Sequence, residues 1–338
     1  MGYRPLGGLS SLKKAIASWL SFEKGVMVDE KQIFICSGSY QALMLALKTL
    51  EIHRKNLTPR LIIENPSYTP IAEGAFECGF QIIPAETDNT GINPASIEKI
   101  DNITAVCVTP SHLFPRGEVY PIKRRLKLCH MTKEKDFYII ENDFEGNFKL
   151  RGAPVPPLLS LDTDRVFYTG TFSQLLYPGI RTGFLVVPKS LLKEANCAIS
   201  ITGYDVPVSV QKALSLLITD GTLSRHRLKM RHKYQKRQAL FIAELKKTFG
   251  SEIHFYGKDT GLYILCEFDG IEFNNKTVDL ILKDGIKADY EFRYYWPHNS
   301  REQAPGLLLG YGQIDENNLN QEIKLLKQSL DKIKNRTF

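Results

Sequence analysis

Short apolar runs alternate with segments of helical period along the first two thirds of the chain. The segment after the first run, Tyr40–Leu50, repeats its apolar residues with the period of a helix. Such alternation predicts an α/β fold, in which a mostly parallel central sheet is flanked by helices on both faces. The runs that we expect to be strands are Lys31–Cys36, Arg60–Ile63, Ala105–Thr109, Phe137–Ile140, Val166–Thr169 and Gly183–Val187.

Polar clusters follow these runs directly. Ser37-Gly38-Ser39 comes after the first, Glu141-Asn142-Asp143 after the fourth and Gly170-Thr171-Phe172-Ser173 after the fifth. In open parallel sheets, ligands bind beyond the carboxyl ends of the strands. The spacing therefore predicts a binding site built from these clusters.

The pattern changes near residue 205. A long helical segment is followed by strand-like runs at Leu262–Phe268 and Gly306–Leu309, and a final helix is expected over Glu316–Lys334. We therefore predict a large α/β domain over residues 1–205, whose first residues form an N-terminal arm. A connecting long helix over residues 206–245 and a small C-terminal α+β domain over residues 246–338 complete the prediction.

Composition narrows the class of protein. The 338 residues are 43% hydrophobic and 24% charged, as in ordinary globular proteins. Neither a membrane-spanning run nor the apolar core of a signal peptide is found in the sequence. The six cysteines are scattered, and none has the spacing of a zinc site. These features predict reduced thiols, a cytoplasmic protein and no metal.

The net charge of +7 is concentrated in one stretch, residues 224–247. Its apolar residues Leu228, Leu240, Ile242 and Leu245 suit a long helix with one buried stripe. Two interpretations fit its lysines and arginines: a solvated helix face, which we favour, and a surface that binds a polyanion.

Three groups of residues suit a phosphorylated aromatic ligand. Backbone N–H groups at Gly38-Ser39-Tyr40, where a helix is expected to begin, make an anion site, although a serine N-cap explains them as well. Thr171, Ser173 and Arg181 offer hydroxyls and a guanidinium, which binds phosphate bidentately. Tyr68 ends another strand and suits stacking on a planar ring.

With these residues in view, the chain resembles the aminotransferase-like domain of MocR/GabR-type regulators of the GntR family. Those regulators fuse a winged-helix DNA-binding domain to a fold-type-I aminotransferase domain, which binds pyridoxal 5'-phosphate (PLP). The resemblance extends over nearly the whole chain. The stretches that carry it include ICSGSYQALML, ENPSYTP, TPSHLFPRG, IIENDFEGNF, GTFSQLLYPGIR and PGLLLGYG.

The resemblance implies a role for each matching position. The cofactor phosphate would lie in a cup formed by Ser39, Tyr40, Thr171 and Arg181, with Ser173 added by the residue pattern. Tyr68 would stack on the pyridine ring. Arg293 would hold the carboxylate of a ligand. His112 would line the pocket, and a loop-capping role is the equal alternative.

The reactive positions of the family differ in this sequence. Gln174 stands where the family has its Schiff-base lysine, and an amide nitrogen cannot form that bond because its lone pair is delocalised. Asn142 replaces the aspartate that pairs with the pyridinium nitrogen, which weakens the electron sink. Phe144 replaces the tyrosine that binds the phenolic oxygen. A register in which Asp143 meets the ring nitrogen stays open at this point.

These substitutions predict a degenerate aminotransferase-like domain that binds PLP, or an amino-acid or phosphate derivative of it, without a covalent link and senses an effector. A PLP-dependent aminotransferase with residual activity and a dimeric scaffold without a ligand are the alternatives. The resemblance implies a homodimer. The sequence contains no helix-turn-helix pattern, so we expect no DNA-binding domain in this chain.

Overall fold

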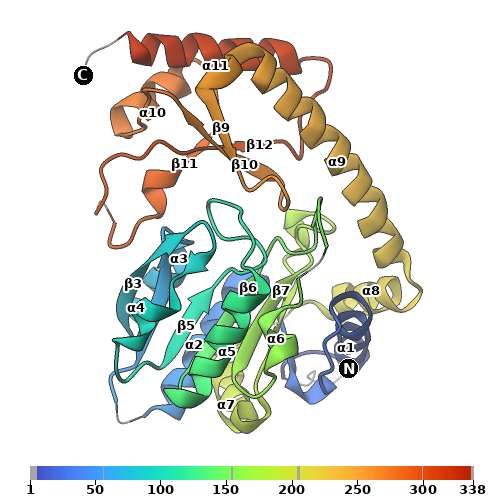
Figure 1. Cartoon of the computed structure of the whole chain (residues 1–338). Coiled ribbons are helices and arrows are strands. Elements are labelled where there is room, and N and C mark those ends of the chain that lie inside the picture. The colour runs from blue at the N-terminus through green and yellow to red at the C-terminus, as the bar shows by residue number, and fades with distance from the viewer. Residues whose placement is uncertain (1–5, 56, 154, 204–205, 299, 336–338) are drawn as a thin grey trace.

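The computed structural model describes all residues except 1–5, 56, 154, 204–205, 299 and 336–338. Two sheets dominate it. The larger sheet and its helices occupy the lower part of Figure 1, and the smaller sheet lies above with its own helices. The ends of the predicted N-terminal arm and of the predicted large domain, at residues 1–5 and 205, lie outside the described residues.

The larger sheet has eight strands in the order β1-β8-β7-β6-β5-β2-β3-β4. Strands β2, β3, β5, β6 and β7 run parallel, while β8 is antiparallel to its neighbours β1 and β7. The strands are β1 (Ile33–Cys36), β2 (Arg60–Asn65), β3 (Gln81–Asp88), β4 (Gly91–Ile92), β5 (Ala105–Val108), β6 (Tyr138–Asp143), β7 (Val166–Thr171) and β8 (Gly183–Val186).

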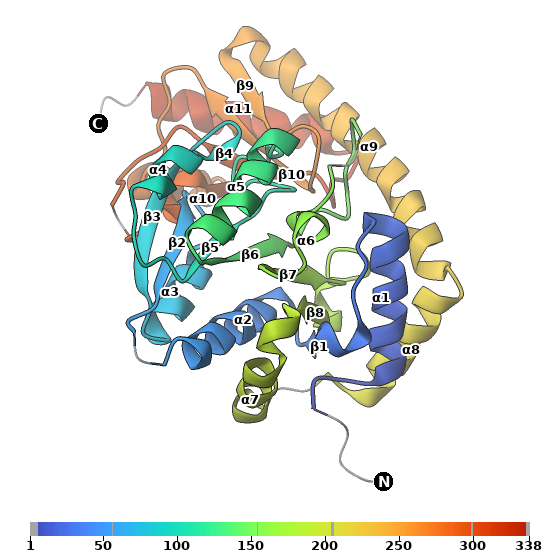
Figure 2. The same cartoon turned by 60° about the horizontal axis from the view of Figure 1, so that its bottom comes forward.

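Helices cover both faces of this sheet, as the sequence predicts (Figure 2). The central strands are apolar and buried on both sides, so each face needs a cover. The helices of this part are α1 (Ser10–Lys24), α2 (Ser39–His53), α3 (Thr69–Glu77), α4 (Pro94–Glu98), α5 (Ile122–Glu134), α6 (Leu158–Leu161), α7 (Leu192–Thr202) and α8 (Val208–Thr219).

Three strands run further than their apolar residues predict. Strand β2 continues to Asn65, β6 to Asp143 and β7 to Thr171. The polar residues at the end of β6 are themselves buried and paired, and Asp143 lies opposite Gly170 in the ladder. Polar side chains that find partners inside the protein extend a strand as well as apolar ones do.

The smaller sheet is antiparallel, with the order β11-β12-β10-β9. Helix α9 (Thr222–Phe249) runs from beside α8 to this sheet and joins the two parts (Figure 1). The predicted apolar stripe on α9 is correct for Ile242 and Leu245, which are buried, and wrong for Leu228 and Leu240, which are exposed. The remaining elements are β9 (Ile253–Tyr256), β10 (Tyr263–Phe268), α10 (Asn275–Lys283), β11 (Asp289–Tyr290), β12 (Leu307–Gly310) and α11 (Leu319–Lys334).

The loop after β5 is tied to the smaller sheet. The guanidinium of Arg116 lies 4.3 Å from the ring centroid of Tyr256 and 3.4 Å from Glu291 Oε1. All six cysteines are free thiols. Among the described residues, no helix has the length and apolarity to cross a membrane.

Candidate functional site

The first predicted phosphate group forms where α2 begins. Gly38 precedes the helix with φ of 104°, a conformation that favours glycine. A Cβ at this position would lie 2.8 Å from Arg181 Nη2, so only glycine lets the guanidinium approach the start of the helix. Arg181 donates a hydrogen bond to the Ser37 carbonyl (3.1 Å). The structure thus brings Arg181 to the N-terminus of α2, which Ser39 and Tyr40 begin.

The second group lies at the end of β7. The Ser173 N–H donates to Thr171 Oγ1 (3.2 Å), which turns the chain sharply after the strand. Ser173 Oγ is buried and has no hydrogen-bond partner among the described residues. A hydroxyl left in this state costs free energy unless a ligand or water completes it. An orphaned hydroxyl and an exposed guanidinium fit a phosphate group.

Aromatic rings supply a planar, apolar wall. Tyr68 and Phe144 pack on Phe114, with ring centroids 6.3 and 5.9 Å away and the rings edge to face. Burial raises the pKa of Tyr68, and Tyr40 and Arg181 are among the charges that act on it. Tyr68 therefore lies near the predicted phosphate residues, as a ring-stacking role requires.

Strand β6 divides its polar residues between the two faces of the sheet. Asn142 Oδ1 accepts a hydrogen bond from Thr169 Oγ1 (3.0 Å). Asp143 accepts one from the Tyr168 hydroxyl and pairs with Lys24 Nζ at 3.0 Å. Successive residues of a strand point to opposite faces, so Asn142 and Asp143 belong to different sides of the sheet. We call these sides the Asn142 face and the Asp143 face.

The partners of Asp143 bear on the open question of register. A carboxylate held by Lys24 and Tyr168 on the Asp143 face is turned away from Asn142 and Thr169. The lysine and the tyrosine lower the pKa of Asp143 against the effect of burial, which is the largest influence on it. Asn142 is therefore the residue of this pair that lies on the side of Thr171, since Thr169 and Thr171 alternate onto the same face.

Gln174 meets a buried acid. Its Nε2 donates to Glu145 Oε1 (3.4 Å), and the Leu262 N–H donates to Glu145 Oε2 (3.3 Å). Burial raises the pKa of Glu145 to about 8, since neither donor carries a charge. Glu145 also lines a cavity of about 480 Å³ with Phe144 and Tyr263. A carboxyl group thus lies beside the position at which the family has its lysine.

His112 is fixed as a neutral side chain beside this acid. The Thr260 hydroxyl donates to the Gly117 carbonyl (3.0 Å), so Thr260 Oγ1 must accept from His112 Nδ1–H at 2.7 Å. Nε2 then accepts from the Tyr263 hydroxyl, also at 2.7 Å. Burial lowers the pKa of His112 to about 3, in keeping with the neutral ring. His112 Nε2 lies 3.4 Å from Glu145 Oε2, so His112 contacts the acid beside Gln174 and does more than cap a loop. We call Gln174, Glu145, His112, Thr260 and Tyr263 the Gln174 cluster.

Arg293 is not brought together with the other predicted residues. Its side chain is 45% exposed, and its charged neighbour is Asp289 at 3.9 Å. The rings of Tyr290 and Phe292 lie beneath its guanidinium. Its predicted role in holding a carboxylate stays a prediction.

Sequence reasoning missed three members of the site: Glu145, Thr260 and Tyr263. Glu145 follows Phe144 in the same polar segment, and an acid two residues beyond the strand end was the available signal. Thr260 and Tyr263 come from the loop before β10 and from β10 itself. Nothing local in the sequence marks them, because they reach the site only through the packing of the smaller sheet.

Comparisons with known proteins agree with this geometry. The sequence matches the family model "Aminotransferase class I and II" over residues 1–288. It is 31% identical over 332 residues to the uncharacterized HTH-type transcriptional regulator YdeL of Bacillus subtilis, covering 96% of this chain and 69% of that protein. It is 27% identical to the probable rhizopine catabolism regulatory protein MocR of Rhizobium meliloti, covering 97% of this chain and 65% of the relative.

A further relative is the pyridoxine biosynthesis regulator PdxR of Corynebacterium glutamicum, 27% identical over 94% of this chain and 67% of that protein. The chain thus spans about two thirds of the length of these regulators.

Solved structures support the fold. The kynurenine aminotransferase of Pyrococcus horikoshii superposes with a TM-score of 0.86 at 24% identity, covering 98% of this chain and 83% of that one. The α-aminoadipate aminotransferase LysN of Thermus thermophilus superposes with a TM-score of 0.85 at 20% identity, covering 98% and 84%. The predicted fold class is confirmed: the chain has the fold-type-I architecture and belongs to the class I and II aminotransferase family, with HTH-type transcriptional regulators among its relatives.

Proposed function

We propose that this chain is an effector-sensing domain that binds a vitamin B6 phosphate without a covalent link and does not transaminate. The observation that carries the proposal is the contact of Gln174 with Glu145, because a lysine is missing where the family forms its covalent bond. PLP bound to a lysine supplies an electron sink for reactions at an amino-acid carbon. With Gln174, Asn142 and Phe144 at the reactive positions, the chain keeps groups that bind and lacks groups that activate.

The residues of the site favour the amine form of such a ligand. Glu145 is buried beside two uncharged donors, so its ionised form has no cation to compensate it. A ligand ammonium would supply that charge. Asn142 fits the same ligand, because Thr169 holds its Oδ1 and leaves Nδ2 as a donor toward an unprotonated ring nitrogen. The proposed ligand class is therefore pyridoxamine 5'-phosphate or an amino-acid conjugate of PLP.

The proposal includes a homodimer. Tyr40 is 40% exposed in the single chain, and Arg181, which lines a cavity of about 330 Å³ with it, is also exposed. A second copy that covers these residues would remove water from the phosphate cup and strengthen its charged hydrogen bonds. Light scattering of the purified chain, with and without ligand, measures the association.

Thermal unfolding with added ligands tests the binding proposal. Pyridoxamine phosphate at about 100 times its Kd should add roughly 2.7 kcal/mol to the free energy of unfolding. PLP should stabilise the chain less and give no absorption band of a lysine-bound cofactor. Glu145→Gln should reduce the affinity for pyridoxamine phosphate at least about tenfold and leave that for PLP nearly unchanged. An unshifted transition with both compounds would remove the proposal.

Restoring the lysine provides the complementary test. Gln174→Lys should give a visible-region band with PLP that borohydride reduction abolishes, because the amine would lie beside Glu145 in an otherwise complete cup. Gln81→Lys, which adds a lysine on the exposed edge of the larger sheet, is the matched control and should give no such band. A band of equal strength in the unaltered chain would contradict non-covalent binding.

One observation favours residual aminotransferase activity as the second candidate. Lys287 lines the same cavity as Phe144 and Glu145, so it is the lysine best placed to replace the missing one. In that case borohydride would fix PLP to Lys287 in the unaltered chain, and Lys287→Met would abolish both the adduct and amino-group transfer. Our proposal expects neither adduct nor transfer.

A further inference from the structure

A third cavity lies on the Asp143 face of the larger sheet. Its volume is about 240 Å³, and it is bounded by α1, by the segment after β6 and by the first turns of α9. Trp19, Pro156 and Pro157 give it apolar walls. We call it the rear cavity. Its five basic side chains are Lys24, Arg125, Lys149, Arg227 and Arg231.

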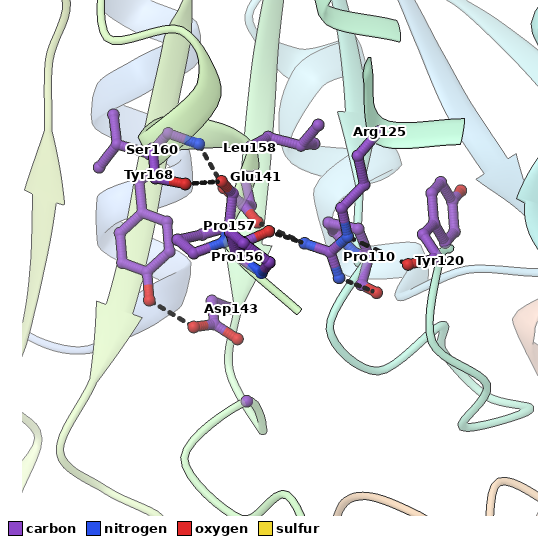
Figure 3. A network of polar contacts seen from close by, with 12 residues as sticks. Pro110, Tyr120, Arg125, Glu141, Asp143, Pro156, Pro157, Leu158, Ser160 and Tyr168 are labelled. Carbon is purple, nitrogen blue, oxygen red and sulfur yellow. Dashed lines mark hydrogen bonds and ion pairs between the residues drawn. The ribbon is translucent and has the colours of Figure 1, made fainter. Parts of the chain in front are cut away.

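Three of these cations have acidic partners. Lys24 pairs with Asp143 at 3.0 Å, and Arg227 pairs with Glu23 at 2.5 Å. The fully buried Arg125 lies 3.6 Å from Glu141. It also donates to the carbonyls of Pro110, Tyr120 and Pro156, as Figure 3 shows.

The other two cations have none. Within the described part of the chain, the side chains of Lys149 and Arg231 have no carboxylate within 4.0 Å and no hydrogen-bond partner. The Lys149 ammonium is partly buried, and this burial lowers its pKa. Asp259 acts on the Lys149 charge from beyond ion-pair distance, so two cations of the rear cavity lack a close acidic partner.

Hydrogen-bond donors around the rear cavity are also without partners. Trp19 is only 6% exposed, and its Nε1 is a buried donor that no described residue accepts. The Nε atoms of Arg227 and Arg231 are also buried and have no hydrogen-bond acceptor among the described residues. One buried acceptor, Asn147 Oδ1, also lacks a partner. Buried donors in native proteins nearly always have a partner, so the unpaired indole N–H of Trp19 points to an acceptor supplied from outside. Arginine Nε atoms without a partner also occur away from this cavity, as at Arg54 and Arg237, so those of Arg227 and Arg231 only add to that donor.

We propose that the rear cavity is a second binding site, which takes a small molecule carrying a phosphate or carboxylate group. The unpaired cations supply the charge, and Trp19, Arg227 and Arg231 supply the donors. A volume of 240 Å³ corresponds to about eight water molecules, the size of a small organic anion rather than of a polymer. Asn147 Oδ1 suits a hydroxyl or amino group on the same molecule.

This site does not depend on the proposed cofactor function. It shares no side chain with the phosphate cup, and its cations lie on α1, α5, α9 and the segment after β6. It does touch the Gln174 cluster at one point. Thr260 lines the rear cavity, and its hydroxyl accepts the hydrogen bond from His112 that fixes the tautomer of that ring.

Trp19 makes the test direct, since the chain has only two tryptophans. In a Trp296→Phe background, Trp19 is the sole tryptophan, and its fluorescence, excited at a wavelength that tyrosine does not absorb, reports on the rear cavity. Inorganic phosphate titrated into this protein at low ionic strength should give a saturable change in emission, and succinate in a parallel titration separates the phosphate source from the carboxylate source. Arg231→Met should weaken binding at least about tenfold, the loss typical of one charge-assisted hydrogen bond.

Matched variants separate the two sites. Lys233→Met removes an exposed charge from the same helix and should leave the titration unchanged. Arg181→Ala disables the phosphate cup and should also leave the Trp19 response intact, whereas it should abolish stabilisation by pyridoxamine phosphate. Lys149→Met provides a second lining variant should Arg231→Met fail to fold. The proposal is overturned if the emission of Trp19 responds to neither anion into the millimolar range. It is also overturned if the Arg231→Met and Lys149→Met proteins bind the anion as tightly as the parent protein.

Discussion

The two faces of strand β6 differ in charge: the Asp143 face carries ionisable side chains, and the Asn142 face carries a neutral amide. On the Asp143 face, Glu141 and Asp143 are buried acids with cationic partners at 3.6 and 3.0 Å. On the Asn142 face, the strand presents an amide bonded to a hydroxyl. The contrast teaches that the carboxylates of this strand are those that pair with cations in the folded chain. The position that we propose for the cofactor nitrogen carries a neutral amide.

The largest expected effect comes from breaking the charge network of the Asp143 face. Arg125→Met would leave Glu141 buried without a cation and three carbonyls without a donor, so we expect a loss of about 3 to 5 kcal/mol in the free energy of unfolding. Urea denaturation measures it. Lys127→Met on the same helix is the control, because Lys127 and its partner Glu98 are both half exposed, and it should cost far less. Equal losses in the two variants would refute the special place of Arg125.

A smaller effect separates the two neighbours on β6. Asp143→Asn should lower the free energy of unfolding by about 2 kcal/mol, because Lys24 and Tyr168 lose a charged acceptor. It should leave the affinity for pyridoxamine phosphate within about twofold. Asn142→Ala should do the reverse and weaken the ligand more than the fold. Calorimetric titration together with denaturation checks both halves, and identical behaviour of the two variants would erase the distinction between the faces.

The pH dependence of stability contains a contribution from Glu145, beside those of Glu64, Glu118 and Glu141, whose pKa values burial also raises. Its folded-state pKa of about 8 lies above the ordinary value of 4.5, so the folded chain binds more protons than the unfolded chain between these values. Glu145 therefore lowers the free energy of unfolding as pH rises through this window, by at most about 1.4 kcal/mol per pH unit. Glu145→Gln should remove that decline, and the exposed Glu134→Gln should not. Saturating pyridoxamine phosphate should also flatten the slope in the unaltered chain.

The smallest effect is expected at Arg293. The side chain is 45% exposed and pairs loosely with Asp289, so Arg293→Gln should change the free energy of unfolding by less than about 0.5 kcal/mol. The carboxylate role predicted for it requires a separate result. The affinity for a phosphopyridoxyl amino acid should fall in this variant while that for pyridoxamine phosphate stays constant, and equal affinities for both compounds would end that prediction.

Much of the fold followed from local patterns. The apolar runs predicted strands β1, β2, β5, β6, β7 and β8, since each is buried on both sides and bounded by polar turns. Strand β3 was missed because its burial is broken by exposed residues. The polar ends of β6 and β7 were assigned to loops because nothing in the sequence reveals that Glu141 and Asp143 have partners from α5 and α1.

The residues of the site also fall into those that the sequence predicted and those that it did not. Gly38 and Ser173 were found because they stand at a helix start and just after a strand end, and Arg181 because it lies in the turn that leads into β8, where position along the chain predicts position in space. The contacts of the Gln174 cluster and the rear cavity were not predicted, because their residues come from elements far apart in the sequence. The basic stretch on α9 shows the limit clearly. Most of it is the solvated helix face that we favoured, yet Arg227 and Arg231 line the rear cavity.

The alternation of side chains along β6 also has an evolutionary consequence. Residues 142 and 143 are adjacent in the chain, but under the proposed function they are constrained differently, Asn142 by ligand binding and Asp143 by the stability of the folded chain. A lineage that stops transaminating can therefore drift at 142 while 143 stays under purifying selection. Catalytic residues can thus be lost one at a time while the fold keeps its stability.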